Sequence, residues 1–236
     1  MNRQLTTRIA DFHFAPTEKS KTNLLVENIQ ESQIFITGNT VIDALKETVK
    51  KVSQQTPLFA ETIPFSSKKV ILITGHRREN FGEGMQRICE VFKEIAEMRQ
   101  DVHLVYPVHL NPNVKNIVHE ILGNIANISL IEPLNYPDFI WMMHASYFII
   151  TDSGGVQEEA PGLGKPVLVT RDTTERPEAV TAGTVKLVGT NSIKLKSAIL
   201  ELLDQPEAYK AMSKAHNPYG DGKASARILD IVKKNL

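Results

Sequence analysis

The residues from Thr151 to Ala179 hold the densest group of side chains and backbone amides that could bind a charged ligand. The sequence Asp-Ser-Gly-Gly at 152–155 follows an apolar run at 147–150, which is typical of a buried parallel strand. The residues from Val156 onward begin a helix. A strand, a glycine-containing turn and a helix N-terminus together form an anion site, so this segment predicts binding of a diphosphate.

Three residues near this turn are expected to hold the phosphates. The hydroxyl group of Ser153 and the amides of Ser153 and Gly154 are placed to donate hydrogen bonds to phosphate oxygens. A second apolar strand at 166–169 ends in a polar loop, from which Arg176 could bridge to the same ligand with its planar guanidinium group. The combination predicts a nucleotide-sugar site.

Carboxylates nearby suit the hydroxyl groups of such a ligand. Glu175 and Glu178 lie in the loop after the second strand, where they could accept hydrogen bonds from a sugar or a ribose. Glu159 lies in the helix after the turn and could reach a ribose diol, although the helix dipole alone also favours an acid there. Both interpretations of Glu159 stay open.

A second set of candidate groups follows two other predicted strands. His76 and Arg77 come after the strand at 70–73, and His109 comes after the strand at 102–106. Because ligands of open α/β sheets bind at the carboxyl ends of the strands, these loops are expected at the same edge as the anion turn. His76 could transfer a proton or contact a phosphate, and Arg77 suits a phosphate or a carboxylate. The alternative for His76 and Arg77 is a solvated loop whose charges pair among themselves. For His109 the alternative, slightly favoured, is a loop histidine hydrogen-bonded to the backbone.

Two aromatic residues and the remaining histidines have simpler interpretations. Phe139 and Trp141 lie in a predicted helix and suit either the hydrophobic core or contact with a nucleobase, the core being favoured. The other histidines have no third ligand at a suitable spacing, so no metal site is predicted.

The composition excludes several classes of protein. The 27 basic and 27 acidic residues balance, so no overall charge attracts nucleic acid or an anionic membrane. The single cysteine, Cys89, excludes an internal disulfide and is expected to be a buried structural thiol. No apolar run approaches the ~18 residues of a membrane span, and the N-terminus lacks the apolar segment of a signal peptide. We therefore expect a soluble, cytoplasmic protein.

Strands and helices alternate along the chain, which is typical of an α/β fold. Strands are expected at 10–14, 33–36, 70–73, 102–106, 128–131, 147–150 and 166–169. Helices are expected at 17–27, 40–52, 84–98, 114–122, 136–144, from 156, and at 192–203, 205–214 and 224–234. This order predicts one complete doubly wound domain at 68–205 and the remnant of another at 1–52. A linker at 53–67 and a helical tail at 206–236 complete the chain.

Seven motifs together resemble the non-hydrolysing bacterial UDP-N-acetylglucosamine 2-epimerases. They are APTEKS at 15–20, TGNT at 37–40, GHRREN at 75–80, VYPVHLNPNV at 105–114, TDSGGVQEEAPGLGKPVL at 151–168, RDTTERPEA at 171–179 and NPYGDG at 217–222. The resemblance covers essentially the whole chain. It implies the GT-B architecture of two Rossmann-like domains, here one complete UDP-binding domain and the end of an N-terminal one. It also implies that neither NAD nor a metal is needed.

The resemblance implies an isomerase that interconverts UDP-GlcNAc and UDP-ManNAc, supplying UDP-ManNAc for a cell-surface polysaccharide. UDP is eliminated to leave a 2-acetamidoglucal and is then added again with C2 inverted. His76 is implied as the active-site histidine near the diphosphate. The residues implied to bind UDP are Phe139 at the uracil, Ser153, Gly154 and Glu159 at the phosphates and ribose, and Arg176 across the cleft. Arg77 and His109 match residues that hold a second, activating UDP-GlcNAc, and the family is typically homodimeric.

The family members are longer, and their N-terminal domain carries an aspartate and two glutamates used in proton transfer and elimination. Met1-Asn2-Arg3 resembles the end of the family motif P-E-E-x-N-R, so these carboxylates are expected to be missing. Because a positioned acid or base contributes ~10²–10⁴-fold to a rate, the chain alone is expected to be impaired. Two alternatives are a non-catalytic UDP-binding half of a split or degenerate epimerase, and a GT-B glycosyltransferase. The motifs GHRREN and RDTTERPEA favour an epimerase over a transferase.

Overall fold

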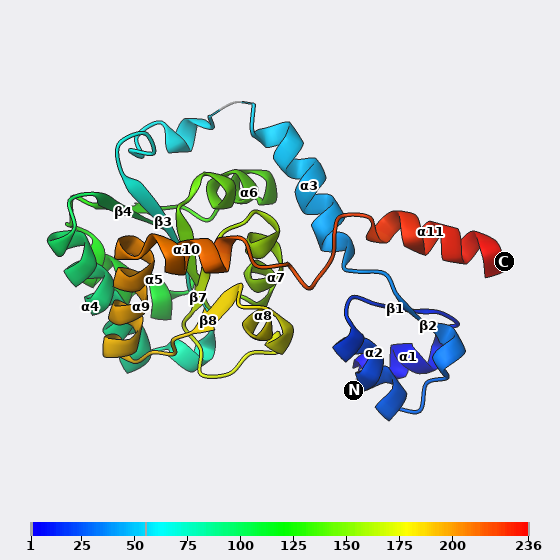
Figure 1. The fold of residues 1–236 in the computed structure, drawn as a ribbon. Helices are drawn as coiled ribbons and strands as arrows, with labels where there is room; N and C mark the ends of the chain where they lie inside the picture. The colour runs from blue at the N-terminus through cyan, green and yellow to red at the C-terminus, as the bar shows by residue number, and fades with distance from the viewer. Residues whose placement is uncertain (1, 55, 236) are drawn as a thin grey trace. The chain divides into compact units, whose positions relative to one another are not determined.

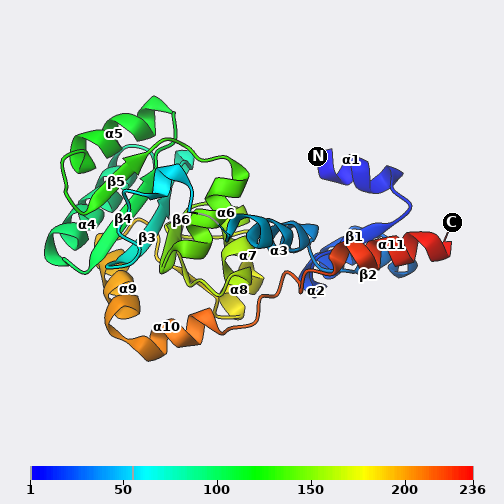
Figure 2. The same cartoon turned by 90° about the horizontal axis from the view of Figure 1, so that it is seen from above.

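The computed structural model describes residues 2–54 and 56–235 and holds them in two compact units. The larger unit runs from Thr48 to His216. The smaller unit joins the described residues up to Glu47 to those from Asn217 onward. Figures 1 and 2 show the course of the chain through each unit from two directions. No helix within the described ranges is long and apolar enough to cross a membrane.

A six-stranded parallel sheet forms the centre of the larger unit (Figure 1). Its strands are β3 (Lys69–Thr74), β4 (Val102–Pro107), β5 (Ile128–Ile131), β6 (Phe148–Thr151), β7 (Val167–Val169) and β8 (Val185–Leu187). They lie in the order β5-β4-β3-β6-β7-β8, so the order reverses between β3 and β6. The register places Thr74 opposite Thr151 at the carboxyl ends of these two strands. In open α/β sheets such a reversal opens a ligand-binding crevice at that end.

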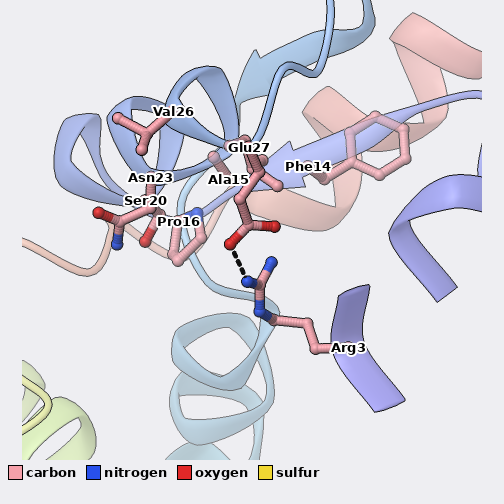
Figure 3. Close-up of a pocket in the computed structure, with 9 residues that line it drawn as sticks. Arg3, Phe14, Ala15, Pro16, Ser20, Asn23, Val26 and Glu27 are labelled. Carbon is pink, nitrogen blue, oxygen red and sulfur yellow. Dashed lines mark hydrogen bonds and ion pairs between the residues drawn. The ribbon is translucent and has the colours of Figure 1, made fainter. Parts of the chain in front are cut away.

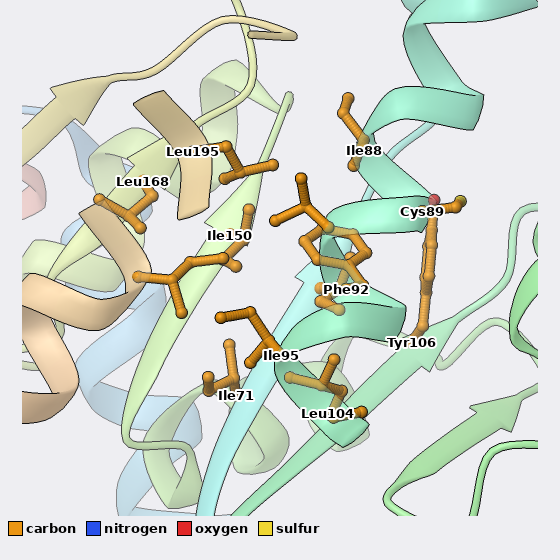
Figure 4. Close-up of a cluster of buried hydrophobic side chains, with 14 of the residues drawn as sticks. Ile71, Ile88, Cys89, Phe92, Ile95, Leu104, Tyr106, Ile150, Leu168 and Leu195 are labelled. Carbon is orange, nitrogen blue, oxygen red and sulfur yellow. The ribbon is translucent and has the colours of Figure 1, made fainter. Parts of the chain in front are cut away.

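Helices cover both faces of this sheet. They are α4 (Glu83–Met98), α5 (Pro112–Leu122), α6 (Tyr136–Ala145), α7 (Gly154–Gly162), α8 (Pro177–Thr181), α9 (Ser192–Asp204) and α10 (Pro206–Ser213). On one face, α4, α5 and α9 form the main core, and Figure 4 shows Ile71 and Ile150 of the sheet beside Phe92 of α4. On the other, α6 contacts β3, α7 contacts β6 and β7, and α8 contacts β8. Leu72 and Ile149 face that side and are also fully buried. Burial on both faces explains why the strands are apolar without alternation.

The smaller unit contains a two-stranded parallel sheet with helices beside it. Its elements are α1 (Asn2–Ile9), β1 (His13–Ala15), α2 (Glu18–Val26), β2 (Ile34–Ile36), the first part of α3 (Thr40–Val52) and α11 (Ala224–Asn235). Phe14 of β1 lies opposite Phe35 of β2, with their ring centroids 6.1 Å apart. Thr17 caps α2, because its hydroxyl oxygen accepts the backbone N–H of Ser20 at 3.1 Å.

The TGNT and NPYGDG motifs contact each other within the smaller unit. The backbone N–H of Asn39 donates to the carbonyl oxygen of Tyr219 at 2.7 Å. Gly38 has a φ of +85°, and a Cβ there would lie 3.3 Å from the Cα of Gly220. The two chain segments therefore approach too closely for a side chain at Gly38, and its backbone conformation also favours glycine.

The same contact region begins the last helix. The carboxylate of Asp43 accepts the backbone N–H groups of Ala224 and Ser225 at 3.1 and 2.9 Å. It thus satisfies amide donors in the first turn of α11 that have no partner within the helix. This contact attaches α11 to the N-terminal part of the chain.

Most predicted elements are confirmed to within one or two residues, and β5 has the predicted bounds. The sequence pattern does not predict α1, α8 or β8. The last two contain five and three residues, which is too few for a periodic pattern to be recognised. The strand predicted at 10–14 is corrected to His13–Ala15, because α1 extends to Ile9 and a bend precedes the strand.

The predicted domain boundaries, at 52, 67 and 205, stay a prediction. Two compact units defined by contacts do not establish which segments fold independently. The helices of the predicted tail are divided between them, since α10 belongs to the larger unit and α11 to the smaller.

Candidate functional site

A cleft of about 260 Å³ opens at the carboxyl ends of the central strands of the larger unit. Its lining residues are Thr74, Gly75, His76, Pro107, His109, Pro133, Leu134, Phe139, Ser153, Gly155, Val156 and Glu159. They come from the segments that follow β3, β4, β5 and β6. The cleft therefore brings together five residues predicted for the site: His76, His109, Phe139, Ser153 and Glu159.

A larger hollow of about 450 Å³ lies in the smaller unit (Figure 3). Phe14, Pro16, Ser20 and Asn23 contribute to its lining, and an ion pair between Arg3 and Glu27 lies at its edge. The two charged groups already neutralise each other there. The cleft at the strand ends, with its histidines, backbone amides and carboxylate, is the better candidate for a ligand site.

The position of His76 is set by Asp152, the first residue after β6. Nδ1 of His76 lies 3.2 Å from Oδ1 of the Asp152 carboxylate. The backbone N–H groups of His76 and Arg77 both donate to Oδ2 at 2.8 Å. The hydrogen bond to Asp152 raises the pKa of His76, outweighing partial burial and the nearby positive charge of Arg77, which lower it.

His109 lies beside His76 on the same side of the cleft. The two rings stack with their centroids 5.7 Å apart and their planes 20° from parallel. Nδ1 of His109 accepts the backbone N–H of Asn111 at 3.1 Å, so a neutral His109 carries its proton on Nε2. The structure therefore places the two predicted histidines together, although they lie in loops after different strands.

The predicted anion turn is present at the start of α7. The backbone N–H of Ser153 donates to the hydroxyl oxygen of Thr151 at 2.9 Å, and the helix begins directly afterwards, at Gly154. This start is two residues earlier than predicted, so Gly154 and Gly155 supply N–H groups of the first turn. A Cβ on Gly154 would lie 3.9 Å from Nη2 of Arg77, so this guanidinium group lies beside the turn. Amides and a cation thus surround one position suited to an anion.

Glu159 forms part of the cleft wall. It is only 7% exposed, and the hydroxyl group of Tyr136 donates to its Oε1 at 2.8 Å. Burial raises the pKa of Glu159 even though the bond from Tyr136 lowers it. Oε2 would lie 3.8 Å from a Cβ on Gly155, which places the carboxyl group next to the anion turn. It is better placed to accept a hydrogen bond from a ligand hydroxyl inside the cleft than to face solvent.

Arg176 does not line the cleft. Its Nε forms an ion pair with the buried carboxylate of Glu158, and its Nη1 donates to the carbonyl oxygen of Glu175 at 3.2 Å. Arg176 also precedes the first residue of α8. The structure thus ties it to α7 beside the cleft and does not bring it together with the five lining residues.

The loop acid Glu175 is held by Arg171. Nη1 and Nη2 of Arg171 donate to the two carboxylate oxygens at 2.7 and 3.1 Å. The bonds from Arg171 lower the pKa of Glu175 to about 2. Nε of Arg171 donates in turn to Glu79 at 2.6 Å. The pair with Glu79 joins the RDTTERPEA and GHRREN motifs, and the pair with Glu175 occupies a carboxylate predicted to face the sugar.

Phe139 and Trp141 have different surroundings although both lie in α6. Trp141 packs edge-on against Phe59 and Phe65, with ring centroids 6.1 and 5.2 Å away. Phe139 lines the cleft together with Pro133 and Leu134. The favoured core interpretation therefore suits Trp141, whereas Phe139 belongs to an apolar wall of the cleft.

Sequence reasoning did not assign roles to Asp152 and Tyr136. An aspartate directly after a buried strand is a signal that could have identified Asp152, because that position lies at the ligand end of the sheet. Tyr136 could not be paired with Glu159 without knowing how α6 and α7 pack. Burial raises the pKa of Cys89 to about 12, which agrees with a structural thiol. Among residues 2–54 and 56–235, no group of three or more His, Cys, Asp or Glu could hold a metal ion.

Comparison with known proteins gives a consistent assignment. A family model described as UDP-N-acetylglucosamine 2-epimerase matches residues 1–233. The UDP-N-acetylglucosamine 2-epimerase of Escherichia coli K12 is 55% identical over 239 residues, covering 99% of this chain and 64% of the relative. The Campylobacter jejuni enzyme of the same name is 52% identical, covering 99% of this chain and 63% of the relative. The chain thus spans somewhat less than two thirds of the curated relatives it matches.

Solved structures agree with the sequence comparison. The UDP-GlcNAc 2-epimerase from Neisseria meningitidis bound to UDP-GlcNAc is 48% identical with a TM-score of 0.91, covering 99% of this chain and 64% of that one. The UDP-GlcNAc 2-epimerase from Methanocaldococcus jannaschii is 36% identical with a TM-score of 0.83, and the match covers 99% of this chain and 65% of that one. The wall teichoic acid polymerase TagF, at 18% identity and a TM-score of 0.57, shares the fold alone. These comparisons confirm the predicted GT-B-like fold class and the resemblance inferred from the motifs.

Proposed function

Because the chain belongs to the UDP-N-acetylglucosamine 2-epimerase family, we propose that it takes part in the interconversion of UDP-GlcNAc and UDP-ManNAc. The observation that carries this proposal is the cleft itself. It combines an apolar wall, an anion turn at a helix N-terminus and the imidazole of His76, which lies beside the buried carboxylate of Asp152. The carboxyl group of Glu159 completes the lining. Each part has the chemistry to meet one part of a UDP-sugar.

The UDP moiety is proposed to lie across the switch between β3 and β6. Its diphosphate would accept hydrogen bonds from the amides of Ser153 and Gly154 and from the imidazole of His76. Uracil would pack on the apolar wall that contains Phe139. Glu159 would accept a hydrogen bond from a ribose hydroxyl. Arg176 would reach the ligand from beside the cleft, after a rotation that releases its ion pair with Glu158.

The proposed reaction is an elimination followed by an addition. A base removes the proton from C2 of the sugar, the bond between C1 and the phosphate oxygen breaks, and a 2-acetamidoglucal and UDP result. A proton then returns to C2 on the opposite face while the phosphate oxygen of UDP bonds to C1 again. The motif resemblance assigns the C2 proton transfers to carboxylates in the relatives' N-terminal domain. The residues described here are proposed to stabilise the negative charge that develops on the leaving diphosphate, and His76 would contribute to this in its protonated form.

Arg77 and His109 are proposed to contact a second, activating UDP-GlcNAc. Their positions support this role, because Arg77 lies beside the anion turn and His109 stacks on His76. A second ligand at these residues would therefore be in direct contact with the first. The homodimer, the cytoplasmic location and the supply of a cell-surface polysaccharide stay predictions.

A UDP-binding protein without turnover is the second candidate, since the chain spans 64% of a relative such as the Escherichia coli enzyme. Incubating the protein with UDP-GlcNAc in D₂O, and following C2 by proton NMR, separates the candidates. Deuterium at C2 with UDP-ManNAc appearing would establish epimerisation by this chain. UDP binding without exchange at C2 would favour the second candidate. The absence of both binding and exchange would contradict the proposed function.

A further inference from the structure

Asp152 is a buried carboxylate whose two oxygens both contact the loop that carries His76. Its side chain is fully buried. Oδ2 accepts the backbone N–H groups of His76 and Arg77 at 2.8 Å, and Nδ2 of Asn80 lies 3.5 Å away. Oδ1 has no hydrogen-bond partner among the described residues, and its near polar neighbour is Nδ1 of His76, 3.2 Å away. One oxygen thus fixes the backbone of the loop, and the other contacts its imidazole.

The sheet brings these two residues together. His76 comes two residues after the end of β3, and Asp152 comes directly after β6. The strands are neighbours at the point where the strand order reverses, and the hydroxyl groups of Thr74 and Thr151 are 2.6 Å apart there. The contact between His76 and Asp152 therefore lies at the point of the sheet where the strand order reverses.

The loop is also fixed from beneath. Asn80 is buried and donates to the carbonyl oxygen of Thr170 at 3.1 Å, and Tyr106 donates to the carbonyl oxygen of Gly75 at 3.3 Å. A Cβ on Gly75 would lie only 2.8 Å from the hydroxyl oxygen of Tyr106, so the loop is packed directly on this buried ring. The backbone that carries His76 therefore cannot move away from Asp152 without displacing this packing.

The contact decides which ring nitrogen carries the proton. A carboxylate oxygen and a deprotonated nitrogen are both acceptors, so a hydrogen bond between them requires a proton on Nδ1. Nε2 is then left for the cleft, as an acceptor in the neutral ring and as a donor in the charged ring.

Four charged or titratable groups lie around the imidazole of His76 or in its cleft. Asp152 faces it from the start of the loop after β6, Arg77 follows it in its own loop, and His109 stacks on it from the loop after β4. Glu159 of α7 lines the same cleft. Asp152 raises the pKa of His76 more than burial and Arg77 lower it. Burial acts to raise the pKa of Asp152, but the bonds from His76 and from the two backbone N–H groups lower it overall.

We propose that Asp152 is a positioning residue for His76. It holds the imidazole with a proton on Nδ1 and with Nε2 turned toward the cleft, where the charged ring donates to an oxygen of the ligand's phosphate group. The identity of that ligand rests on the proposed function. The tautomer and charge of His76 do not, because they are properties of the ligand-free protein.

The test is the substitution Asp152→Asn, studied by ¹⁵N and ¹³C NMR of the histidine rings in the ligand-free protein. Asparagine retains an oxygen for the backbone N–H groups but presents an NH₂ group to Nδ1. The wild-type neutral ring is expected to carry its proton on Nδ1. In the variant the proton moves to Nε2 and the pKa of His76 falls. His76→Gln assigns the signals, and Asp204→Asn, at a half-exposed carboxylate paired with Arg99, serves as the matched control.

UDP binding at pH 7 gives the second measurement. Asp152→Asn is expected to weaken UDP binding by roughly three- to tenfold, because a neutral ring that donates from Nε2 forms a weaker hydrogen bond to phosphate than a charged ring does. Asp204→Asn is expected to leave the Kd unchanged. A wild-type ring protonated on Nε2 would overturn the proposal even if the variant did not fold. An unchanged tautomer and pKa in a folded variant would also overturn it. Failure of the wild type to bind UDP would contradict the proposed function instead, while the NMR result would still decide the role of Asp152.

Discussion

The charge on His76 connects stability to pH. Its pKa in the folded protein is raised by Asp152 above the ordinary value of 6.5. The resulting stabilisation is fully present below the pKa of the unfolded chain and is lost as the pH rises through the folded pKa. Asp152 behaves in the opposite sense, because its pKa is lowered in the folded protein. Its stabilisation is present when the pH is above the pKa of an unfolded aspartate, and it is lost as the pH falls through the folded pKa.

We therefore expect His76→Gln to flatten the dependence of stability on pH. The difference in unfolding free energy between wild type and variant should be largest at about pH 6 and should shrink toward pH 8. Urea denaturation at several pH values measures it. His119→Gln, on α5 and away from the cleft, is the control. A difference that grew with pH would contradict the pairing of His76 with Asp152.

Arg176 tests whether a residue beside the cleft reaches the ligand. Arg176→Ala should weaken UDP binding by about 1.5–3 kcal/mol, as for a hydrogen bond to a charged group. Arg87→Ala removes a similar side chain from α4, where it pairs with Glu83, and should leave the affinity unchanged. Calorimetry that gave the same Kd for both variants as for wild type would remove Arg176 from the site.

The residues of the site were partly predictable. Ser153 and His76 follow strand ends, and Glu159 lies in the helix that begins after Ser153, so position and side-chain type were sufficient to select them. The direction of Arg176 was not predictable, because it depends on an ion pair with Glu158, 18 residues earlier. Separating Phe139 from Trp141 required the packing of Phe59 and Phe65, which lie far from α6 in the sequence.

At the scale of elements, the loop after β3 depends on a close contact with β4. A side chain at Gly75 would meet the hydroxyl oxygen of Tyr106 at 2.8 Å. Gly75→Ala should therefore destabilise the protein by about 1–3 kcal/mol, as overpacking does. Tyr106→Phe removes that oxygen, so the double variant should be more stable than the sum of the two single effects. Urea denaturation of the wild type, the two single variants and the double variant measures these changes in unfolding free energy. If the changes of the two single variants simply added up in the double variant, the contact between residue 75 and Tyr106 would not be the cause of the destabilisation.

The elements of the larger unit were predictable because they are long, apolar and clearly bounded. Asn111, Asn135 and Asn191 each cap a helix with the side-chain oxygen, at 3.0 Å from a backbone nitrogen. By contrast, β8 (Val185–Leu187) is defined by its pairing with β7 and by little else. A strand that short is specified by its neighbour in the sheet, which no local pattern contains.

At the scale of the whole molecule, the two units differ in how much core they contain. The larger unit has a core whose residues come from β3, β4, β5, β6 and β7 and from the helices on one face of the sheet. In the smaller unit, Ala15 and Ile34 of the two-stranded sheet form a buried cluster with Ile29, and Leu24 packs against it. We expect the amides of β1 and β2 to exchange with solvent faster than those of β3 and β4. Hydrogen exchange measured by NMR tests this, and equal protection in the two sheets would contradict it.

The grouping of α11 with the N-terminal part of the chain was not predictable. It depends on Asp43, which binds amides 181 and 182 positions later. The glycines of TGNT and NPYGDG indicated turns, yet their partners lie in each other's motif. Local chemistry could identify the turns but not the contact between them.

Calorimetric titration of the protein with UDP, and in parallel with uridine, tests most directly whether the cleft is a diphosphate site. We expect UDP to bind with one molecule per site and uridine to bind at least tenfold more weakly, because several amides and His76 are proposed to contact the phosphates. His76→Ala should reduce the difference between the two ligands. Equal affinity for UDP and uridine, or no binding of UDP, would contradict the assignment of this cleft.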